Sequence, residues 1–459
     1  MTDRHLFYTS GVDGSTGAVS RPITSRQVVD GLAQRGVVWA GRGLPVGVDG
    51  DDLAQVGWAL ITDDGLDPAV LDALAPLLEL RRQQAGRLYR DDIVYLRGRR
   101  RAHFFADLGL SPGPPDPEVL PYFVLIVGEP TGVPYRIEHG LDDERAVGRL
   151  AFDRVEDYAR YARAVVQSET RTVTPTSVIF PIRHPDDRLT ALSTDSLAHP
   201  VARHLEQLAE NEGSHPPPRL VDADTATKSR LLEVLRRPPS LLLTSGHAAR
   251  FPAAHRRQAD EQGALLCADW PGPRRSRGPL MPGHLFAASD LPDNALDGLI
   301  AYFFACDTVG TPHADSFEPA RAQRTRLALE PFVAALPKAM LAQPAGPALA
   351  VAGHVDQTFA PTYHWPGVGS RADTFLDFTQ RLLRGERLGH ALESFGDRAQ
   401  QLATTFLETH DTLMLERNLE ITDDEIEELA EIWMAYRDAR SVSVLGDPAV
   451  RVGVIAPDA

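Results

Sequence analysis

The sequence has little cysteine and no long apolar run. Two of its 459 residues are cysteines, Cys267 and Cys306, so a disulfide scaffold is excluded and a reducing compartment is expected. No apolar run approaches the roughly 18 residues of a membrane-spanning helix, and the first residues lack the apolar stretch of a secretory signal. These absences predict a cytoplasmic protein that does not engage a membrane.

Positive charge is scarce as well. Lysine and arginine total 47 against 63 acidic residues, which gives a net charge of −16, and the lysines are Lys228 and Lys338 alone. Such a surface repels phosphate backbones, so a nucleic-acid partner is not expected. With 43% hydrophobic and 24% charged residues, the chain has the composition of a globular protein with a large core.

Several cofactor motifs are missing. The sequence has no phosphate-binding loop of the form G-x-x-x-x-G-K-[ST], no H-E-x-x-H metal motif and no G-x-S-x-G elbow. Gly41-Arg42-Gly43 follows no strand and lacks the third glycine of a dinucleotide fingerprint. Two cysteines without a histidine pair argue against a zinc site. We therefore expect neither a metal nor a cofactor.

Short apolar runs alternate with stretches of helical period from Trp58 onward. Runs of this kind are typical of parallel strands that are buried on both faces of a sheet. They lie at 58–61, 122–127, 177–180, 241–243, 264–266, 299–304, 348–352 and 442–445.

The alternation of strand and helix predicts a doubly wound α/β fold. The helix that contains Ile426 and Trp433 follows a capping box, Thr422 with Glu425. We divide the chain into a turn-rich segment (1–50), an α/β subdomain (51–170) and a larger catalytic domain (171–459) with a helical insert (371–440).

The clearest candidate site joins the ends of two apolar runs. His247 follows Leu-Leu-Leu-Thr-Ser-Gly, and Cys306 follows Tyr-Phe-Phe-Ala. Sites in open α/β sheets form at the carboxyl ends of strands, so neighbouring strands would bring imidazole and thiol into one cleft. The imidazole could then take the thiol proton during attack and later protonate a leaving amine.

The alternative interpretation is packing, because a lone cysteine at a strand end is most often a core residue. We assign Cys267, which continues a strand, to the core in this way. For Cys306 both interpretations stay open. If it is catalytic, a backbone N–H of the turn at Gly246 and Ala248 could hold the oxyanion of an acyl intermediate.

The ordered set of motifs resembles the caspase-like cysteine peptidases, and gingipain-like or CHAT-domain bacterial proteases in particular. That family places its histidine, usually followed by glycine, after one core strand and its cysteine after the next. The resemblance extends over residues 50 to 455 and implies a three-layer α/β/α sandwich with a mostly parallel sheet and a smaller N-terminal subdomain. Ala248 stands where the family has glycine, which would strain the chain if φ were positive there.

The resemblance also implies a substrate pocket built from Asp307, Asp356 and Trp365. Asp307 could contact a basic substrate side chain or tune the thiol, or it could be a solvated carboxylate at a helix start. Asp356 could pair with arginine or lysine, or it could be a surface turn residue. The caspase Gln-Ala-Cys pattern is absent, so cleavage after aspartate is not implied.

We therefore predict a cytoplasmic bacterial cysteine endopeptidase that cleaves proteins or peptides through a thioester on Cys306, with His247 as acid and base. Two alternatives keep the same fold: a catalytically silent binding module, and an effector that a regulatory protein partner activates. A third alternative is an unrelated α/β protein in which Cys306 is structural.

Overall fold

The computed structural model describes residues 6–7, 23–24, 44, 47–110, 115–213, 215–276, 278–315, 326–365, 368–415 and 422–455. Most of the predicted turn-rich segment 1–50 lies outside these ranges. Contacts divide the chain into two units, Met1–Ala40 with Gln400–Trp433, and Gly41–Ala399 with Met434–Ala459. In the first unit, β1 (Leu6–Phe7) pairs antiparallel with β2 (Ile23–Thr24).

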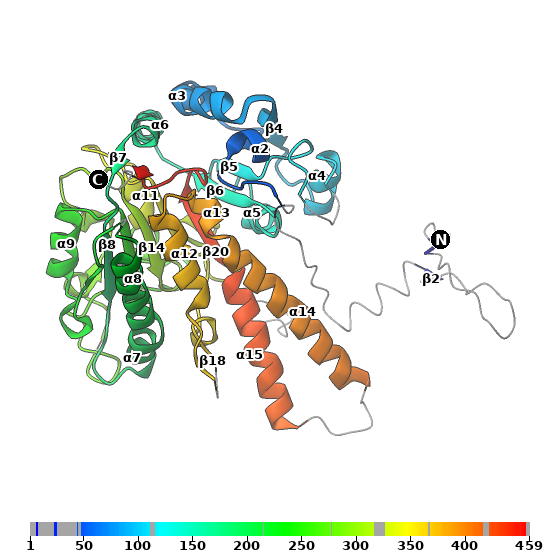
Figure 1. Ribbon diagram of the computed structural model, residues 1–459. Helices are drawn as coiled ribbons and strands as arrows, with labels where there is room; N and C mark the ends of the chain where they lie inside the picture. The colour runs from blue at the N-terminus through cyan, green and yellow to red at the C-terminus, as the bar shows by residue number, and fades with distance from the viewer. Residues whose placement is uncertain are drawn as a thin grey trace, which may run out of the picture. The chain divides into compact units, whose positions relative to one another are not determined.

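A ten-stranded sheet forms the centre of the second unit (Figure 1). In spatial order its strands are β4 (Tyr89–Tyr95), β3 (Trp58–Asp63), β5 (Phe123–Val127), β6 (Ala146–Leu150), β20 (Val442–Gly446), β17 (Ala350–His354), β14 (Ile300–Phe304), β10 (Leu241–Ser245), β8 (Ser177–Pro181) and β9 (Arg219–Leu220).

Neighbouring strands of this sheet are parallel except at one seam. The seam lies between β17 and β20, which pair antiparallel. On one side of it β20, β6, β5, β3 and β4 run in one direction, and on the other side β17, β14, β10, β8 and β9 run in the opposite direction. The carboxyl ends of β8, β10 and β14 therefore lie on the same edge of the sheet.

The sheet is covered on both faces, which explains the all-apolar runs. Along β3, Trp58 and Leu60 join one buried cluster while Ala59 and Ile61 join another, because successive side chains of a strand point to opposite faces. The first cluster includes residues of α3 and α6, and the second includes residues of α4 and α5. This half of the sheet is thus the middle of three layers.

Helices connect the strands along the chain. They are α2 (Leu53–Val56), α3 (Pro68–Ala85), α4 (Arg101–Asp107), α5 (Tyr135–Asp142), α6 (Val155–Glu169), α7 (Arg188–Ser193), α8 (His199–Glu212), α9 (Lys228–Arg236), α10 (Gln258–Glu261), α11 (Ala335–Leu341), α12 (Asp373–Leu383), α13 (Leu388–Ala391), α14 (Glu393–Leu415) and α15 (Asp423–Ala439). No helix among the described residues is long and apolar enough to cross a bilayer.

Short strand pairs lie outside the large sheet. A three-stranded antiparallel sheet consists of β11 (His247–Ala248), β12 (Leu265–Leu266) and β13 (Leu285–Phe286). The remaining pairs are β15 (Gly310–Thr311) with β16 (Phe332–Val333), β18 (His364–Trp365) with β19 (Gly369–Ser370), and β21 (Val454–Ile455) with β7 (Thr172–Val173).

The predicted fold class is confirmed: the protein is α/β with a mostly parallel central sheet. One predicted strand is placed differently, because the run 264–266 belongs to the small antiparallel sheet. The sequence interpretation missed the edge strand β4, which has exposed positions and carries Asp91 and Asp92. Strands from both sides of residue 170 share the large sheet, and the domain boundaries themselves stay a prediction.

The segment predicted as a helical insert does contain α12 to α15, and it lies between β17 and β20. The capping box before α15 is present. The Thr422 backbone N–H donates to Glu425 Oε2 (2.8 Å), and the Glu425 N–H donates to Thr422 Oγ1 (3.4 Å). These reciprocal bonds satisfy N–H groups that the first turn of a helix leaves unpaired.

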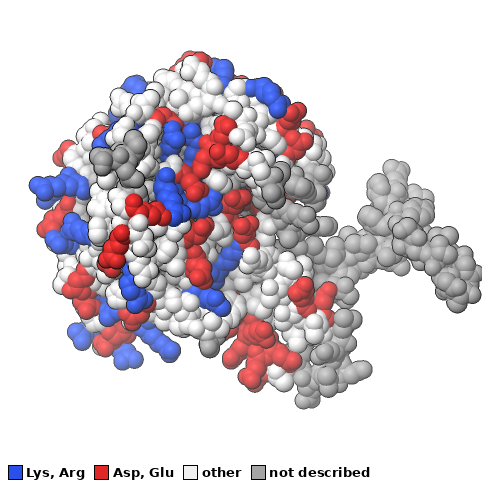
Figure 2. All heavy atoms as spheres, viewed as in Figure 1, with Lys and Arg blue, Asp and Glu red and all other residues white. Residues whose placement is uncertain are grey.

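Charged groups are interspersed on the face shown in Figure 2, but one charged network is buried. Arg81, on α3, bonds to Asp447 Oδ2 and to Glu169 Oε1, both at 2.7 Å. Arg387 bonds to the same Glu169 oxygen at 2.9 Å, and Trp58 Nε1 donates to Asp447 Oδ1 at 3.0 Å. The network ties α3, α6 and β3 to the segments that precede α13 and follow β20.

We expect this network to make the free energy of unfolding decrease as the pH becomes acidic. Burial alone would raise the pKa of Glu169, but Arg81 and Arg387 outweigh it and lower that pKa to about 2, from an ordinary value of 4.5. A carboxyl whose pKa is lowered by folding stabilises the protein above its unfolded pKa, and this contribution is lost as pH falls. Urea unfolding at pH 6 and pH 3 should therefore show a loss of about 2 kcal/mol, most of it below pH 4.5.

The matched control for this prediction is the exposed Glu79. Glu169→Gln should lower stability at pH 6 and flatten the acid dependence, whereas Glu79→Gln, which affects an exposed ion pair with Arg82, should do neither. An unchanged pH slope in Glu169→Gln would contradict the assignment.

Candidate active site

The two predicted reactive side chains follow neighbouring strands at the same edge of the sheet. β10 and β14 are parallel and in register, with Ser245 opposite Phe304, and the Gly246 N–H donates to the Phe304 carbonyl at 3.1 Å. His247 and Cys306 each come two residues after this matched pair. Because paired strands lie about 4.8 Å apart, the imidazole and the thiol start from adjacent backbone positions.

His247 is held by a carboxylate that the sequence interpretation did not include. Its Nε2 lies 2.6 Å from Oδ2 of Asp187, and its side chain is 34% exposed. An ionised carboxylate can only accept hydrogen bonds, so Nε2 carries the proton and Nδ1 keeps the lone pair of a base. Burial raises the pKa of Asp187, but the hydrogen bond from His247 outweighs it and the net shift is downward, which keeps this carboxylate ionised.

Asp187 comes from the loop after β8, the strand next to β10. It also caps α7, since its Oδ1 accepts from the Leu189 N–H at 3.0 Å. A signal for it was present in the sequence: the polar run Arg183-His184-Pro185-Asp186-Asp187 directly follows a buried strand. What the sequence could not show is that β8 neighbours β10.

His184 lies against the ring of His247. Its ring is stacked parallel to that of His247, with centroids 5.9 Å apart, and it meets Trp270 edge-on at 4.9 Å. Burial, followed by the nearby His247, lowers the pKa of His184 to about 4. A neutral imidazole can therefore lie against His247 without repelling the imidazolium that would form there.

Cys306 lies against the loop that follows β17. Its Sγ accepts from the Thr358 N–H at 3.5 Å and lies 4.0 Å from the Thr358 carbonyl oxygen. Burial raises the pKa of Cys306 to about 11 despite the bond from Thr358. Cys267 is fully buried on the small sheet, as the sequence predicted, and burial raises its pKa to about 12.

The two backbone groups predicted to hold an oxyanion differ in availability. The Gly246 N–H is engaged with Phe304. Ala249 donates to Ala264, and N–H groups alternate sides along an antiparallel strand, so the N–H of Ala248 points away from β12. Ala248 is also absent from the described non-glycine residues with positive φ, so alanine causes no backbone strain at this position.

Asp307 and Asp356 are both buried, and both contact the same arginine. Arg250 Nε lies 2.6 Å from Asp307 Oδ2, and its Nη2 lies 3.4 Å from Asp356 Oδ1. The Asp307 N–H also donates to the Asp356 carbonyl at 2.7 Å. Neither carboxylate is therefore a solvated surface group, and a guanidinium of the chain itself occupies the position that a basic substrate side chain was expected to take.

The backbone at this edge is strained. Asp186, Asp307 and Asp356 have φ of 60°, 56° and 85°, and Ala254 is the fourth such non-glycine residue in the described part of the chain. Strain of this kind persists where surrounding contacts hold it, and it concentrates at functional sites. Here three of the strained residues belong to the loops that surround His247 and Cys306.

Trp365 lies on β18, at the start of a hairpin in the loop that follows β17. The neighbouring His364 is partly exposed, and its Nδ1 forms a hydrogen bond with Ser196 Oγ at 3.1 Å. Trp365 is also partly exposed. The structure places it beyond Thr358 on the same loop, and its predicted role in a substrate pocket stays a prediction.

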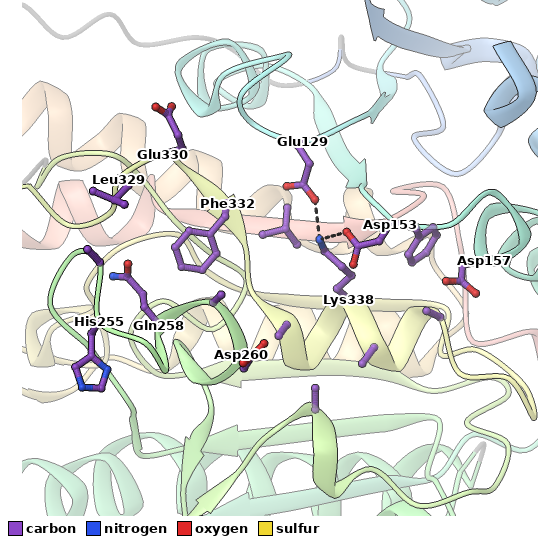
Figure 3. A pocket seen from close by; sticks show the side chains of 18 residues that line it. Glu129, Asp153, Asp157, His255, Gln258, Asp260, Leu329, Glu330, Phe332 and Lys338 are labelled. Carbon is purple, nitrogen blue, oxygen red and sulfur yellow. Dashed lines mark hydrogen bonds and ion pairs between the residues drawn. The ribbon is translucent and has the colours of Figure 1, made fainter. Parts of the chain in front are cut away.

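A separate cavity of about 750 Å³ lies away from these residues (Figure 3). Lys338 points into it between Glu129 and Asp153, at 2.7 and 3.2 Å. None of the predicted site residues lines it.

Comparisons with known proteins give similar folds and no close relative. No protein-family model and no curated protein matches the chain. Similar solved structures each align with 87% of this chain. One is a protease, with a TM-score of 0.48 and 11% identity over 79% of its own chain. Another is the Arg-specific cysteine proteinase gingipain R, with a TM-score of 0.45 and 13% identity over 79% of its chain. A third is the complex of Porphyromonas gingivalis gingipain pro- and mature domains, with a TM-score of 0.47 and 11% identity over 81% of its chain.

Cysteine proteinases of the gingipain type, which the sequence resembles, are thus among the solved structures similar to this chain. Similarity at this level does not extend to catalytic residues or substrates.

We predict that Arg250 stabilises the folded protein, because it neutralises two buried carboxylates. Arg250→Gln should lower stability at pH 7 by about 3 kcal/mol, the low end for breaking a buried ion pair, because the arginine side chain is 29% exposed. Burial already raises the pKa of Asp307. Such a carboxyl binds its proton more tightly in the folded state, so acid should restore part of the lost stability.

Urea unfolding at pH 7 and pH 5 measures this effect. Arg87→Gln is the control, because Arg87 pairs with Glu118 on the surface, where a pair is worth at most about 1 kcal/mol. A deficit in Arg250→Gln that is equal at both pH values would contradict the role assigned to Arg250.

We also predict that the resting thiol of Cys306 is protonated. Site-resolved mass spectrometry after iodoacetamide treatment should show a rate that increases up to about pH 11, the pKa of Cys306, because the thiolate is the reactive form. Cys267 should react more slowly still, since it is fully buried. A midpoint at or below about pH 7 would instead show a preformed thiolate.

Proposed function

We propose that this protein is a caspase-like cysteine endopeptidase of the gingipain or CHAT type, in which Cys306 is the nucleophile, His247 the acid and base, and Asp187 the residue that orients His247. The observation that carries the proposal is the in-register pairing of β10 with β14, together with the 2.6 Å contact between His247 and Asp187. We further propose that it acts in a bacterial cytoplasm on protein or peptide substrates, without a cofactor.

The first half of the reaction forms a thioester. Because the pKa of Cys306 lies far above neutrality, the thiol proton must move to Nδ1 of His247 as Sγ attacks the scissile carbonyl. The new S–C bond leaves a negative oxygen, for which the Ala248 N–H is the proposed donor. Collapse breaks the C–N bond, and the proton on His247 passes to the leaving amine.

The second half returns the enzyme to its starting state. Water replaces the amine, gives a proton to Nδ1 of His247 and attacks the thioester carbonyl. The S–C bond then breaks, the carboxylic acid leaves, and Sγ regains its proton. Asp187 supports both halves, because it fixes the tautomer and offsets the positive charge that His247 acquires.

The substrate pocket is proposed to include Asp307, Asp356 and Trp365. A basic substrate side chain would have to compete with Arg250 for the two carboxylates, since Arg250 already contacts both. This observation favours a second candidate function: an effector that stays silent until a regulatory protein partner rearranges the Arg250 contacts. Under that alternative the same dyad performs the same chemistry.

The decisive experiment is digestion of a diverse peptide library by the purified full-length protein, read by mass spectrometry. Cys306→Ala should abolish cleavage. Asp187→Asn should retain Cys306 but lose on the order of 100-fold in kcat, because general acid–base catalysis by a correctly oriented histidine contributes that much. Cys267→Ser, which changes the other cysteine, should leave cleavage intact.

Three results would separate the alternatives. Equal cleavage by wild type and Cys306→Ala would contradict the proposed nucleophile. An inactive wild-type protein that becomes active when Arg250 is replaced by glutamine would favour the partner-activated effector. If wild type and Arg250→Gln are both inactive, and the Cys306 thiol is no more reactive than that of Cys267, the endopeptidase proposal is contradicted.

A further inference from the structure

A second cavity lies at the same edge of the sheet, and four arginines are among the residues that line it. Its volume is about 290 Å³. Four guanidinium-bearing residues come together there from three elements: Arg101 from α4, Arg136 from α5, and Arg437 and Arg440 from the end of α15 and the residue after it. Among the described lining residues, Asp356 is the sole carboxylate. Asp143 beside the cavity pairs with two of the arginines, so the lining keeps an excess of positive charge within a chain of net charge −16.

Local contacts hold three of these arginines, Arg101, Arg136 and Arg440, in place with hydrogen-bonding capacity to spare. Arg440 donates to the Tyr436 hydroxyl at 2.9 Å. Arg440 and Arg101 share Asp143, at 2.9 and 3.5 Å. Arg136 donates one bond, to the Tyr95 hydroxyl at 3.4 Å. Each guanidinium has five N–H donors in a planar fork, so the bonds to Asp143 and Tyr95 leave donors for a ligand.

The electrostatics of a neighbouring histidine agree with this picture. His139 lines the cavity and is stacked on Tyr135 at 6.0 Å. Burial, and then Arg440 and Arg437, lower the pKa of His139 to about 3. The imidazole is neutral at physiological pH, so the positive charge at this site comes from arginines alone.

We propose that this cavity is a binding site for a small, multiply charged anion of the phosphate class. Guanidinium groups pair with phosphate oxygens through two parallel hydrogen bonds, a geometry that lysine cannot match. Convergence of four such groups from three elements costs stability through mutual repulsion, which Asp143 offsets for Arg101 and Arg440 and a bound anion would offset further. The volume fits a compact anion such as a diphosphate group.

The site adjoins the nucleophile loop without overlapping the catalytic pair. Asp356 lines the cavity and accepts through its carbonyl from the Asp307 N–H, and Asp307 directly follows Cys306. The cavity also contains Pro312 and Val355 from the loops after β14 and β17. The proposal concerns binding alone and holds whether or not the chain is a peptidase.

Isothermal titration of the full-length protein with inorganic pyrophosphate at low ionic strength tests the site. Wild type should bind, and Arg136→Gln should weaken binding about tenfold, the loss expected when charge-assisted hydrogen bonds are removed. Arg136 is exposed and makes a single long contact, so this variant should fold. Arg437→Gln is a second variant at the same site, and Arg230→Gln, on the exposed face of α9, is the matched control.

Further titrations distinguish the possible sources of the phosphate group. Tighter binding of a nucleoside diphosphate than of pyrophosphate would support the site and indicate a nucleotide, whereas equal or weaker binding would support it and indicate a free anion. Three results would overturn the proposal: no binding of pyrophosphate by wild type, equal binding by Arg136→Gln and wild type, or succinate binding as tightly as pyrophosphate.

Discussion

The site depends on one constraint, the parallel, in-register pairing of β10 with β14. His247 and Cys306 are 59 residues apart in the chain, and no local interaction would bring them together. The backbone ladder that sets Ser245 opposite Phe304 makes their neighbouring positions a consequence of sheet formation. Since both strands are buried on both faces, a shift in register would disrupt the core, and the core therefore protects the geometry of the site.

The same edge of the sheet gathers charge that the interior has to accommodate. Asp187, Asp307 and Asp356 come from loops after three different strands, and each has a cationic or titratable partner, His247 for the first and Arg250 for the other two. Unpaired buried carboxylates would be costly. Positive φ at Asp307 and Asp356 shows that the chain also accepts backbone strain to hold these groups in position.

The antiparallel seam between β17 and β20 places the arginine cavity beside this edge. Because β20 enters the sheet where β17 leaves it, the end of α15 and the residue that follows it are brought against the loop after β17. The parallel strands beyond β20 bring α5 and its arginine to the same place. The charged edge is thus divided into an acid-rich part around Arg250 and an arginine-rich part around Arg440.

The sequence by itself indicated most strands of the large sheet, because all-apolar runs are typical of strands buried on both faces, and it made His247 and Cys306 candidates by their positions after two of those strands. It also located the α15 capping box, which depends on residues three apart. Only the tertiary structure decided that Asp187 orients His247, that Arg250 occupies both carboxylates, and that the run 264–266 leaves the main sheet. These depend on which strands become neighbours, and strand order is set by packing between segments distant in the chain, which local patterns do not encode.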